Sequence, residues 1–259
     1  MKVVIFAGGK GTRISEESHL KPKPMIEIGG RPILWHIMKI YEKHGYKEFI
    51  LCLGYKGYIV KEYFVNYFTH NADVTIELNN NTIEVHNTNS ENFKVTLVDT
   101  GLETMTAGRL QRVQKYITED TFLLTYGDGV SDVNITELIE FHNSHNKIAT
   151  MTAVNPEARF GSMDILPDGL VESFREKPKD ANHWINGGFF VLNKEVFNYF
   201  DKDMTDVMWE EEPMIQLSKD AQLMSYKHYG FWKCMDAMRD KEELEKMWNT
   251  GAAKWKSWD

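Results

Sequence analysis

The chain of 259 residues is 42% hydrophobic and 26% charged, with a formal net charge of −8 at pH 7. This length suits one large domain with its own core, and an acidic chain as a whole repels nucleic acid and anionic membranes. The two cysteines are too few for a disulfide framework. No apolar stretch approaches the ~20 residues that span a bilayer, and the apolar run Val3–Ala7 is too short for the core of a signal peptide. We therefore expect a single domain over residues 1–259, in the cytoplasm.

Strand-like and helix-like segments alternate through the first half of the chain. The apolar run Val3–Ala7 ends in glycines and predicts a buried strand, and a one-sided apolar pattern from Pro32 to Gly45 predicts a helix. Polar turn residues at 79–81 predict a hairpin. The other expected strands are Phe49–Leu53, Val74–Leu78, Thr82–His86, Val95–Val98, Phe122–Thr125 and Ala149–Val154, and the other helices are Tyr58–Phe68, Gly108–Ile117 and Ile135–His145.

The second half is more mixed. A capping-box-like pair, Asp240 and Glu243, predicts the start of a last helix that ends near Trp248. Short strands are expected at Met163–Leu166, Val171–Glu176, Gly188–Leu192 and Met224–His228, with a helix near Pro213–Ala221. The tryptophan-rich tail is expected to pack on the body or on a neighbouring subunit. The alternation as a whole predicts an α/β fold of Rossmann-like type, with a mixed, mostly parallel sheet, helices on both faces and small additional β elements.

A glycine-rich loop, Gly8-Gly9-Lys10-Gly11-Thr12-Arg13, directly follows the first strand. Loops at this edge of an open α/β sheet bind ligands, and glycines let backbone N–H groups approach a phosphate. The loop matches neither the dinucleotide fingerprint nor the P-loop, so it indicates another kind of phosphate site or a tight strand-to-helix turn. The cations of Lys21-Pro22-Lys23-Pro24-Met25 suit a triphosphate, although a solvated basic loop is the ordinary alternative.

Two carboxylates are candidate metal ligands. Asp128 follows a buried strand and lies between glycines, and Mg²⁺ takes few protein oxygens when it also binds phosphate. Asp236 lies in an aromatic stretch, where a carboxylate needs a partner or a metal, although N-capping of a nearby helix is an equal alternative. Asp132 is expected to serve a turn, and the cluster 210–212 to be a solvated helix entrance.

Taken together, the motifs resemble those of the sugar nucleotidyltransferase family. The resemblance runs from residue 1 to the tail and is greatest to the branch that joins CTP to glucose 1-phosphate. It implies the nucleotide-diphospho-sugar transferase fold. The matching motifs are Gly8 to Arg13, Lys21 to Met25, Tyr126-Gly127-Asp128-Gly129, Glu176-Lys177-Pro178 and Ile185-Asn186-Gly187-Gly188.

The resemblance implies an in-line attack by glucose 1-phosphate on the α-phosphorus of CTP, which releases pyrophosphate. It makes Arg13 and Lys23 the catalytic cations and Asp128 and Asp236 the ligands of Mg²⁺. A sugar phosphate is already ionised at neutral pH, so no general base is required. The residues that it implies bind the nucleotide are Gly8, Gly9, Gly11, Thr12, Arg13, Lys23, Arg109 and Gly127. Those that it implies bind the sugar phosphate are Thr106, Glu176, Lys177, Asn186 and Gly187.

The sequence departs from the family pattern at two places. Lys10 stands where relatives commonly carry an apolar residue, and we expect it to point to water; Lys233-Cys234 replaces a glutamine-containing version. The resemblance also implies a homo-oligomer in the form of a hexamer, and a role in supplying CDP-glucose for bacterial surface polysaccharide. The alternatives are an enzyme that uses dTTP or UTP, a non-catalytic nucleotide-sensing homologue, and a metal-dependent glycosyltransferase.

Overall fold

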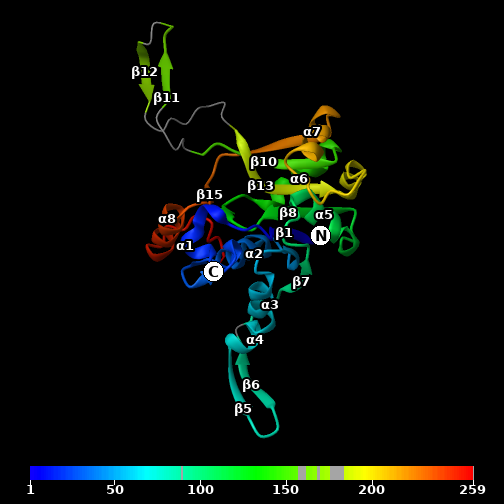
Figure 1. Cartoon of the computed structure of the whole chain (residues 1–259), viewed down its shortest axis with the longest axis vertical. Coiled ribbons are helices and arrows are strands. Elements are labelled where there is room, and N and C mark those ends of the chain that lie inside the picture. Colours follow the sequence, from blue (N-terminus) through cyan, green and yellow to red (C-terminus); the bar gives the residue numbers. More distant parts are fainter. Residues whose placement is uncertain (89, 157–161, 168–169, 176–183, 259) are drawn as a thin grey trace.

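The computed structural model describes residues 1–88, 90–156, 162–167, 170–175 and 184–258; within these ranges, the side chains at 13, 15, 16, 88, 162–165, 172, 174 and 175 are not described. A seven-stranded sheet forms the centre of the molecule, in the order β14-β10-β13-β8-β1-β4-β7 (Figure 1). Its strands are β1 (Val3–Ala7), β4 (Glu48–Leu53), β7 (Lys94–Asp99), β8 (Thr121–Tyr126), β10 (Ala149–Val154), β13 (Ile185–Asn193) and β14 (Leu223–His228).

All neighbouring strands of this sheet pair in parallel except β13, which runs antiparallel to both β8 and β10. The expected α/β fold with a mixed, mostly parallel sheet is therefore confirmed. The central strand β1 is fully buried, and its alternate side chains face two separate apolar cores. This is the pattern of a strand covered on both faces.

Helices cover both faces of the sheet. One core receives α2 (Ile33–Lys43), α3 (Gly57–Val65), α6 (Ile135–His145) and α8 (Met238–Asn249). The opposite core receives α5 (Thr106–Val113), α7 (Glu212–Lys219) and the 3₁₀ segment η4 (Lys194–Tyr199). The short helical turns are η1 (Thr12–Ile14), α1 (Ser15–Ser18), η2 (Lys23–Met25), α4 (Tyr67–His70) and η3 (Gln114–Tyr116).

Small β ribbons surround the sheet. The expected hairpin is formed by β5 (Ala72–Glu77) and β6 (Thr82–Thr88), and it projects away from the body beyond α4 (Figure 1). A second hairpin pairs β11 (Ser162–Ile165) with β12 (Val171–Arg175). Two ribbons were not expected: β2 (Glu27–Ile28) with β3 (Arg31–Pro32), and β9 (Gly129–Ser131) with β15 (Trp232–Cys234).

Three helix predictions were wrong in detail. The single helix expected over Tyr58–Phe68 is divided at Asn66 into α3 and α4. Helix α5 begins at Thr106, earlier than expected, and continues into η3. The last helix starts before the predicted cap, so Asp240 lies in its first turn; its carboxylate accepts the backbone N–H groups of Asp236 and Ala237 at 3.0 and 2.9 Å.

The C-terminal tail packs on the body around His36. This is one of the two arrangements expected for the tail, the other being packing on a neighbouring subunit. The imidazole is fully buried and lies edge-on to the rings of Trp248 and Trp255. Its Nε2 lies 2.8 Å from the carbonyl oxygen of Ile28, and its Nδ1 lies 3.3 Å from the indole Nε1 of Trp255. Since an indole N–H can only donate, Nδ1 accepts and Nε2 carries the proton. Burial lowers the pKa of His36 to about 4.

None of the helices in the described part of the chain has the length and apolar character that a bilayer crossing demands.

Candidate functional site

A cavity of about 470 Å³ opens at the carboxyl ends of β1 and β8, in the middle of the sheet. This edge is where open α/β sheets bind their ligands. The glycine-rich loop and the loop before α5 both contribute to the lining. The lining includes Gly8, Gly9, Lys10, Gly11, Thr12, Lys23, Pro24, Thr104, Thr106, Arg109, Tyr126, Gly127 and Asp128.

The buried side chain of Arg109 holds the glycine-rich loop in place. Its buried guanidinium donates hydrogen bonds to the carbonyl oxygens of Gly8, Leu53, Gly101 and Leu102 at 2.9–3.3 Å, and to the hydroxyl of Thr100 at 2.8 Å. A Cβ at Gly8 would lie only 2.1 Å from a guanidinium nitrogen, so this contact requires glycine. Arg109 lines the cavity, but its donors are directed at protein oxygens, an arrangement that suits a support for the loop.

Among the glycines that line the cavity, Gly11 and Gly127 are the other two that the geometry constrains. Gly11 has a φ of +63°, in the left-handed region that favours glycine, and packs beside Lys23. At Gly127, a Cβ would lie 2.7 Å from the carbonyl oxygen of Phe6, whose oxygen accepts the Gly127 N–H. Both glycines line the cavity, and neither places a side chain between its backbone and a bound phosphate.

Lys23 lies between the two predicted metal ligands. Its ammonium Nζ is 2.6 Å from Oδ2 of Asp128 and 2.7 Å from Oδ1 of Asp236, and the lysine is 8% exposed. Burial alone would lower the pKa of Lys23, but the two carboxylates outweigh burial and raise it. The site therefore holds a cation between two carboxylates that come from distant parts of the sequence.

The ribbon of β9 and β15 brings the two aspartates together. Asp128 immediately precedes β9, and Asp236 follows β15 after one intervening residue. The ribbon pairs Cys234 with Gly129, and the Met235 N–H donates to the carbonyl oxygen of Asp128 at 2.8 Å. The alternative reading of Asp236 as a helix N-cap is not what the structure shows, because Ala237 occupies that position of α8.

The two carboxylates fit a divalent cation. Both approach one positively charged atom, the Lys23 Nζ, so both can converge on one metal ion. Within the described ranges, no group of three or more His, Cys, Asp and Glu side chains forms a metal cluster. Two carboxylates are a sufficient protein contribution for Mg²⁺, which keeps several waters and takes further oxygens from bound phosphate.

The thiol beside this pair is inert. Cys234 donates a weak hydrogen bond to Oδ2 of Asp236 at 3.6 Å. Burial and the neighbouring carboxylates raise the pKa of Cys234 to about 12, so it stays protonated and is not a nucleophile. The neighbouring Lys233 turns the other way and pairs with Glu243 and, at 3.5 Å, with Asp240.

A chain of hydrogen bonds connects two residues of the cavity lining, Tyr126 and Thr106, to residues behind them. The Tyr126 hydroxyl donates to Glu210, and the other carboxylate oxygen of Glu210 accepts the Thr106 hydroxyl at 2.7 Å. The Asn186 amide donates to the Tyr126 oxygen at 3.0 Å. Burial and the adjacent Glu210 carboxylate raise the pKa of Tyr126, so the phenol remains a donor. Thr106 and Asn186, two predicted sugar-phosphate residues, are thus connected through Tyr126 and Glu210.

Sequence reasoning missed the roles of Tyr126 and Glu210. Tyr126 is the first residue of the motif that continues with Gly127 and Asp128, but the sequence predicts a function only for those two. The sequence predicts a solvated helix entrance for Glu210 and its two neighbours, and only Glu211 and Glu212 fit that prediction, because both are exposed. Nothing in the sequence signals that Glu210 bonds to residues from two other elements.

The remaining predicted residues are placed as follows. Thr12 and Lys10 are exposed at the cavity rim, and Lys10 forms an ion pair with Glu103 at 2.8 Å across it rather than pointing only to water. Gly187 lies at the start of β13, where its carbonyl oxygen accepts the Trp232 indole N–H at 2.7 Å. Asp132, expected at a turn, instead joins a segment distant in the sequence, since its carboxylate accepts the Phe231 N–H at 2.7 Å and lies 2.8 Å from Nε2 of His228. Glu176, Lys177 and the side chain of Arg13 lie outside what the structure describes.

Comparison with known proteins finds relatives over the full length of the chain. Residues 2–237 match the family model described as nucleotidyl transferase. Glucose-1-phosphate cytidylyltransferase of Salmonella typhimurium is 55% identical over 260 residues that cover all of both chains, and a probable glucose-1-phosphate cytidylyltransferase of Bacillus subtilis is 46% identical over the same span.

A solved structure shares the fold at lower identity. A putative glucose-1-phosphate thymidylyltransferase from Bacillus anthracis superposes with a TM-score of 0.70 at 16% identity, covering 98% of this chain and 95% of the other. The chain therefore belongs to the nucleotidyl transferase family and, within it, to the group of the glucose-1-phosphate cytidylyltransferases.

Proposed function

We propose that the chain catalyses the reaction of CTP with α-D-glucose 1-phosphate to give CDP-glucose and pyrophosphate. The observation that carries the proposal is the convergence of Asp128 and Asp236 on one cationic position beside the glycine-rich loop. The likeness to cytidylyltransferases over the full length supports the choice of substrates. The use of dTTP or UTP is the alternative that leaves the chemistry unchanged.

The described residues would act by binding and by charge stabilisation. Both substrates are anions, so cations must screen their repulsion before the sugar phosphate can attack the α-phosphorus. The loop from Gly8 to Thr12 would bind the nucleotide through its backbone, and Lys23 would neutralise the triphosphate. Mg²⁺ held by Asp128 and Asp236 would supply further charge neutralisation on the phosphate oxygens. Thr106 and Asn186 would orient the sugar phosphate, with Glu176, Lys177 and Gly187 of the same expected set.

Lys23 has a second role in this proposal. A metal ion and the Lys23 ammonium compete for the same two carboxylates, because both need the Asp128 and Asp236 oxygens. Lys23 therefore keeps the carboxylate pair neutralised before the metal binds. Once its contacts to the aspartates are given up, the ammonium is free to contact the triphosphate.

The reaction is tested by supplying glucose 1-phosphate and Mg²⁺ with CTP, dTTP, UTP or ATP in turn and measuring pyrophosphate release. Release with CTP well above the other three supports the full proposal. Preference for another nucleotide would change the proposed nucleotide substrate and leave the proposed mechanism as it is. A folded protein that releases no pyrophosphate with any nucleotide, yet binds them, would contradict catalysis and favour the nucleotide-sensing alternative.

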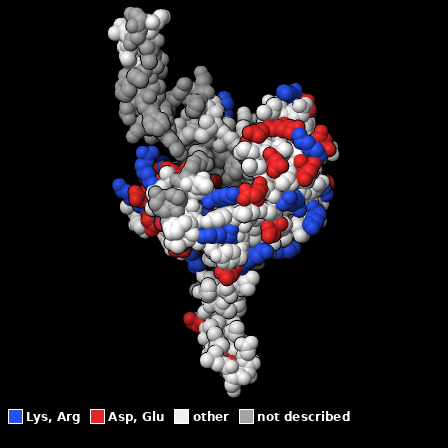
Figure 2. Space-filling view, viewed as in Figure 1, with Lys and Arg blue, Asp and Glu red and all other residues white. Residues whose placement is uncertain are grey.

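We further propose a homo-oligomer, with the hexamer of the family resemblance as its expected form, and a cytoplasmic role in supplying CDP-glucose for surface polysaccharide. The hairpin of β5 and β6 supports self-association, because Ile76 and Ile83 are each more than half exposed on it. Its visible face in Figure 2 is largely free of charged side chains. The two free cysteines, Cys52 and Cys234, suit a reducing compartment.

A further inference from the structure

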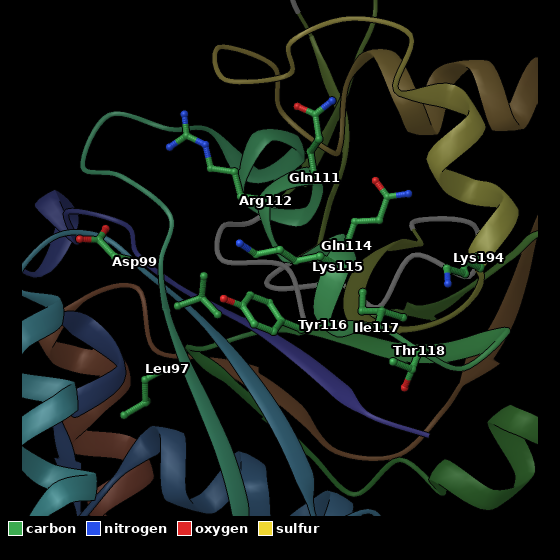
Figure 3. Close-up of a pocket in the computed structure, with 11 residues that line it drawn as sticks. Leu97, Asp99, Gln111, Arg112, Gln114, Lys115, Tyr116, Ile117, Thr118 and Lys194 are labelled. Atoms are coloured by element: carbon green, nitrogen blue, oxygen red, sulfur yellow. The ribbon is translucent and has the colours of Figure 1, made fainter.

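A second cavity of about 880 Å³ adjoins α5 (Figure 3). It is lined by the end of β7, the second half of α5, the turn η3 and Lys194 at the start of η4. Helix α5 separates it from the nucleotide cavity: Thr106 and Arg109 line the nucleotide cavity, whereas Gln111 and Arg112 line the second one. The two cavities are therefore different places on the molecule that share one helix.

The second cavity carries an excess of positive charge. Arg112, Lys115 and Lys194 are among its lining residues, against Asp99 as the one acidic residue of that lining. In the view of Figure 2, basic side chains gather on the side of the body that carries α5 and β7. A local positive field in a chain with a net charge of −8 attracts small anions to this place.

Among the residues that the structure describes, no carboxylate forms an ion pair with these cations. Other lysines of the chain form ion pairs, such as Lys202 with Glu212 at 2.7 Å. In contrast, Lys115 lies over the ring of Tyr116 at 5.2 Å, and no ion pair joins it or Lys194 to a described acid. Arg112 donates only to neutral oxygens, including the Thr100 carbonyl at 2.6 Å and the Thr104 hydroxyl at 2.7 Å.

The lining also offers groups that suit a phosphorylated organic molecule. The partly exposed ring of Tyr116 lies beside the cations and can contact a sugar or a base. Gln114 is exposed on η3 and adds an amide donor. The cavity is in the size range of sites for small molecules, which combine apolar surface with a few polar groups.

We propose that this cavity is a binding site for a small molecule with two or more phosphate groups, distinct from the nucleotide cavity. Lys115 and Lys194 supply its charge from two separate elements, which sets the ligand apart from a singly charged anion. Arg112 is fixed by its bonds to Thr100 and Thr104, in the loop that leads from β7 to α5, and to Thr205, and it adds a third positive charge.

The test is calorimetric titration with inorganic tripolyphosphate, at low ionic strength, of a Lys23→Met variant in which the nucleotide cavity has lost its central cation. We expect one equivalent to bind, and the further change Lys115→Glu with Lys194→Glu to weaken that binding at least tenfold. The matched control is Lys219→Glu with Lys254→Glu, which makes the same charge change at exposed lysines outside the cavity and should leave binding within about twofold.

Two results would overturn the proposal: no tripolyphosphate binding in the Lys23→Met protein, or equal weakening by the lining and control variants. Equal weakening would mean that net charge alone governs binding. Either result leaves pyrophosphate release by the wild-type chain untouched, so failure here is distinct from failure of the proposed reaction. Circular dichroism of each variant verifies that the fold is retained.

Discussion

At the scale of single residues, the site depends on Lys23 and the two aspartates that it joins. A lysine that is 8% exposed stays charged here because two carboxylates lie within 2.7 Å of its nitrogen. The same arrangement places the lysine in competition with any metal ion that uses Asp128 and Asp236. Binding of the metal must therefore overcome an existing ion pair.

This competition predicts that Lys23→Met binds Mg²⁺ or Mn²⁺ more tightly in the absence of nucleotide, although its pyrophosphate release falls. An increase of about tenfold corresponds to about 1.4 kcal/mol. Calorimetric titration with Mn²⁺ measures it, and Lys21→Met is the control, at a partly exposed lysine of the same segment that pairs with Glu27. Unchanged or weaker metal binding in Lys23→Met would contradict the competition.

His36 makes folding stability depend on pH. Its pKa is about 4 in the folded chain against 6.5 when unperturbed, so the unfolded chain binds the proton more readily. A depressed histidine pKa gives stability that is present above the unfolded pKa and is lost as pH falls towards the folded one; between pH 7 and pH 5 the loss is about 2 kcal/mol. Urea unfolding at both pH values should show a smaller loss in His36→Gln than in the wild type, and equal losses would refute this role.

Residues within one local motif were predictable from the sequence, and residues joined across the fold were not. The loop after β1 and Asp128 after β8 were found because a glycine-rich loop or an acid at a strand end is a local pattern. Asp236 was expected as a second metal ligand, but the ribbon of β9 and β15 that places it beside Asp128 was predicted by no local pattern. The bond from Glu210 to Tyr126 has the same origin in tertiary structure.

At the scale of elements, helix α5 holds the loops around the nucleotide cavity in place. Arg109 on this helix joins the loops after β1, β4 and β7 through five hydrogen bonds. All three loops lie at the carboxyl edge of the sheet, so their relative positions depend on one buried guanidinium. Loss of that group leaves several carbonyl oxygens without a donor.

We therefore expect Arg109→Lys to lower the free energy of unfolding by about 2–4 kcal/mol, since one ammonium cannot replace the planar set of donors. The KM for the nucleotide should rise as well, because the loop at Gly8 loses its support. Urea unfolding and steady-state kinetics measure the two effects. Arg239→Lys makes the same change at an exposed arginine and should alter neither; similar behaviour of both variants would contradict the supporting role.

Element types were predicted better than element boundaries. The strands at Val3–Ala7 and Ala149–Val154 and the helix at Ile135–His145 begin and end as expected, because their apolar patterns are continuous. The division of the helix at Asn66 was missed because the apolar pattern runs through it. The start of α8 was missed because the capping carboxylate of Asp240 lies inside the helix rather than before it.

At the scale of the whole molecule, the hairpin of β5 and β6 stands out from the body (Figure 1). Ile76 is 53% exposed and Ile83 is 54% exposed on it, and these two side chains are directly paired across the strands. Exposed apolar side chains on a projecting element mark a surface for another protein. A second copy of this chain is the partner that the family resemblance implies.

The variant with Ile76→Asp and Ile83→Asp should therefore form smaller assemblies than the wild type, as measured by light scattering after size-exclusion chromatography. Ile215→Asp is the control, because Ile215 is 51% exposed on α7. If the hairpin variant forms assemblies of the same mass as the wild type, the hairpin is not part of the contact between subunits. A wild-type chain that is monomeric at micromolar concentration would contradict the oligomer itself.

The central claim is that Asp128 and Asp236 together bind the metal of a nucleotidyl transfer reaction. The most direct test is pyrophosphate release from CTP and glucose 1-phosphate, with Mg²⁺, by the Asp236→Asn protein. Asparagine preserves the size of the side chain and removes the charge. We predict a fall in kcat of at least about 100-fold, comparable with loss of a main charge-stabilising group, in a protein that remains folded. A kcat within threefold of the wild type would contradict the claim.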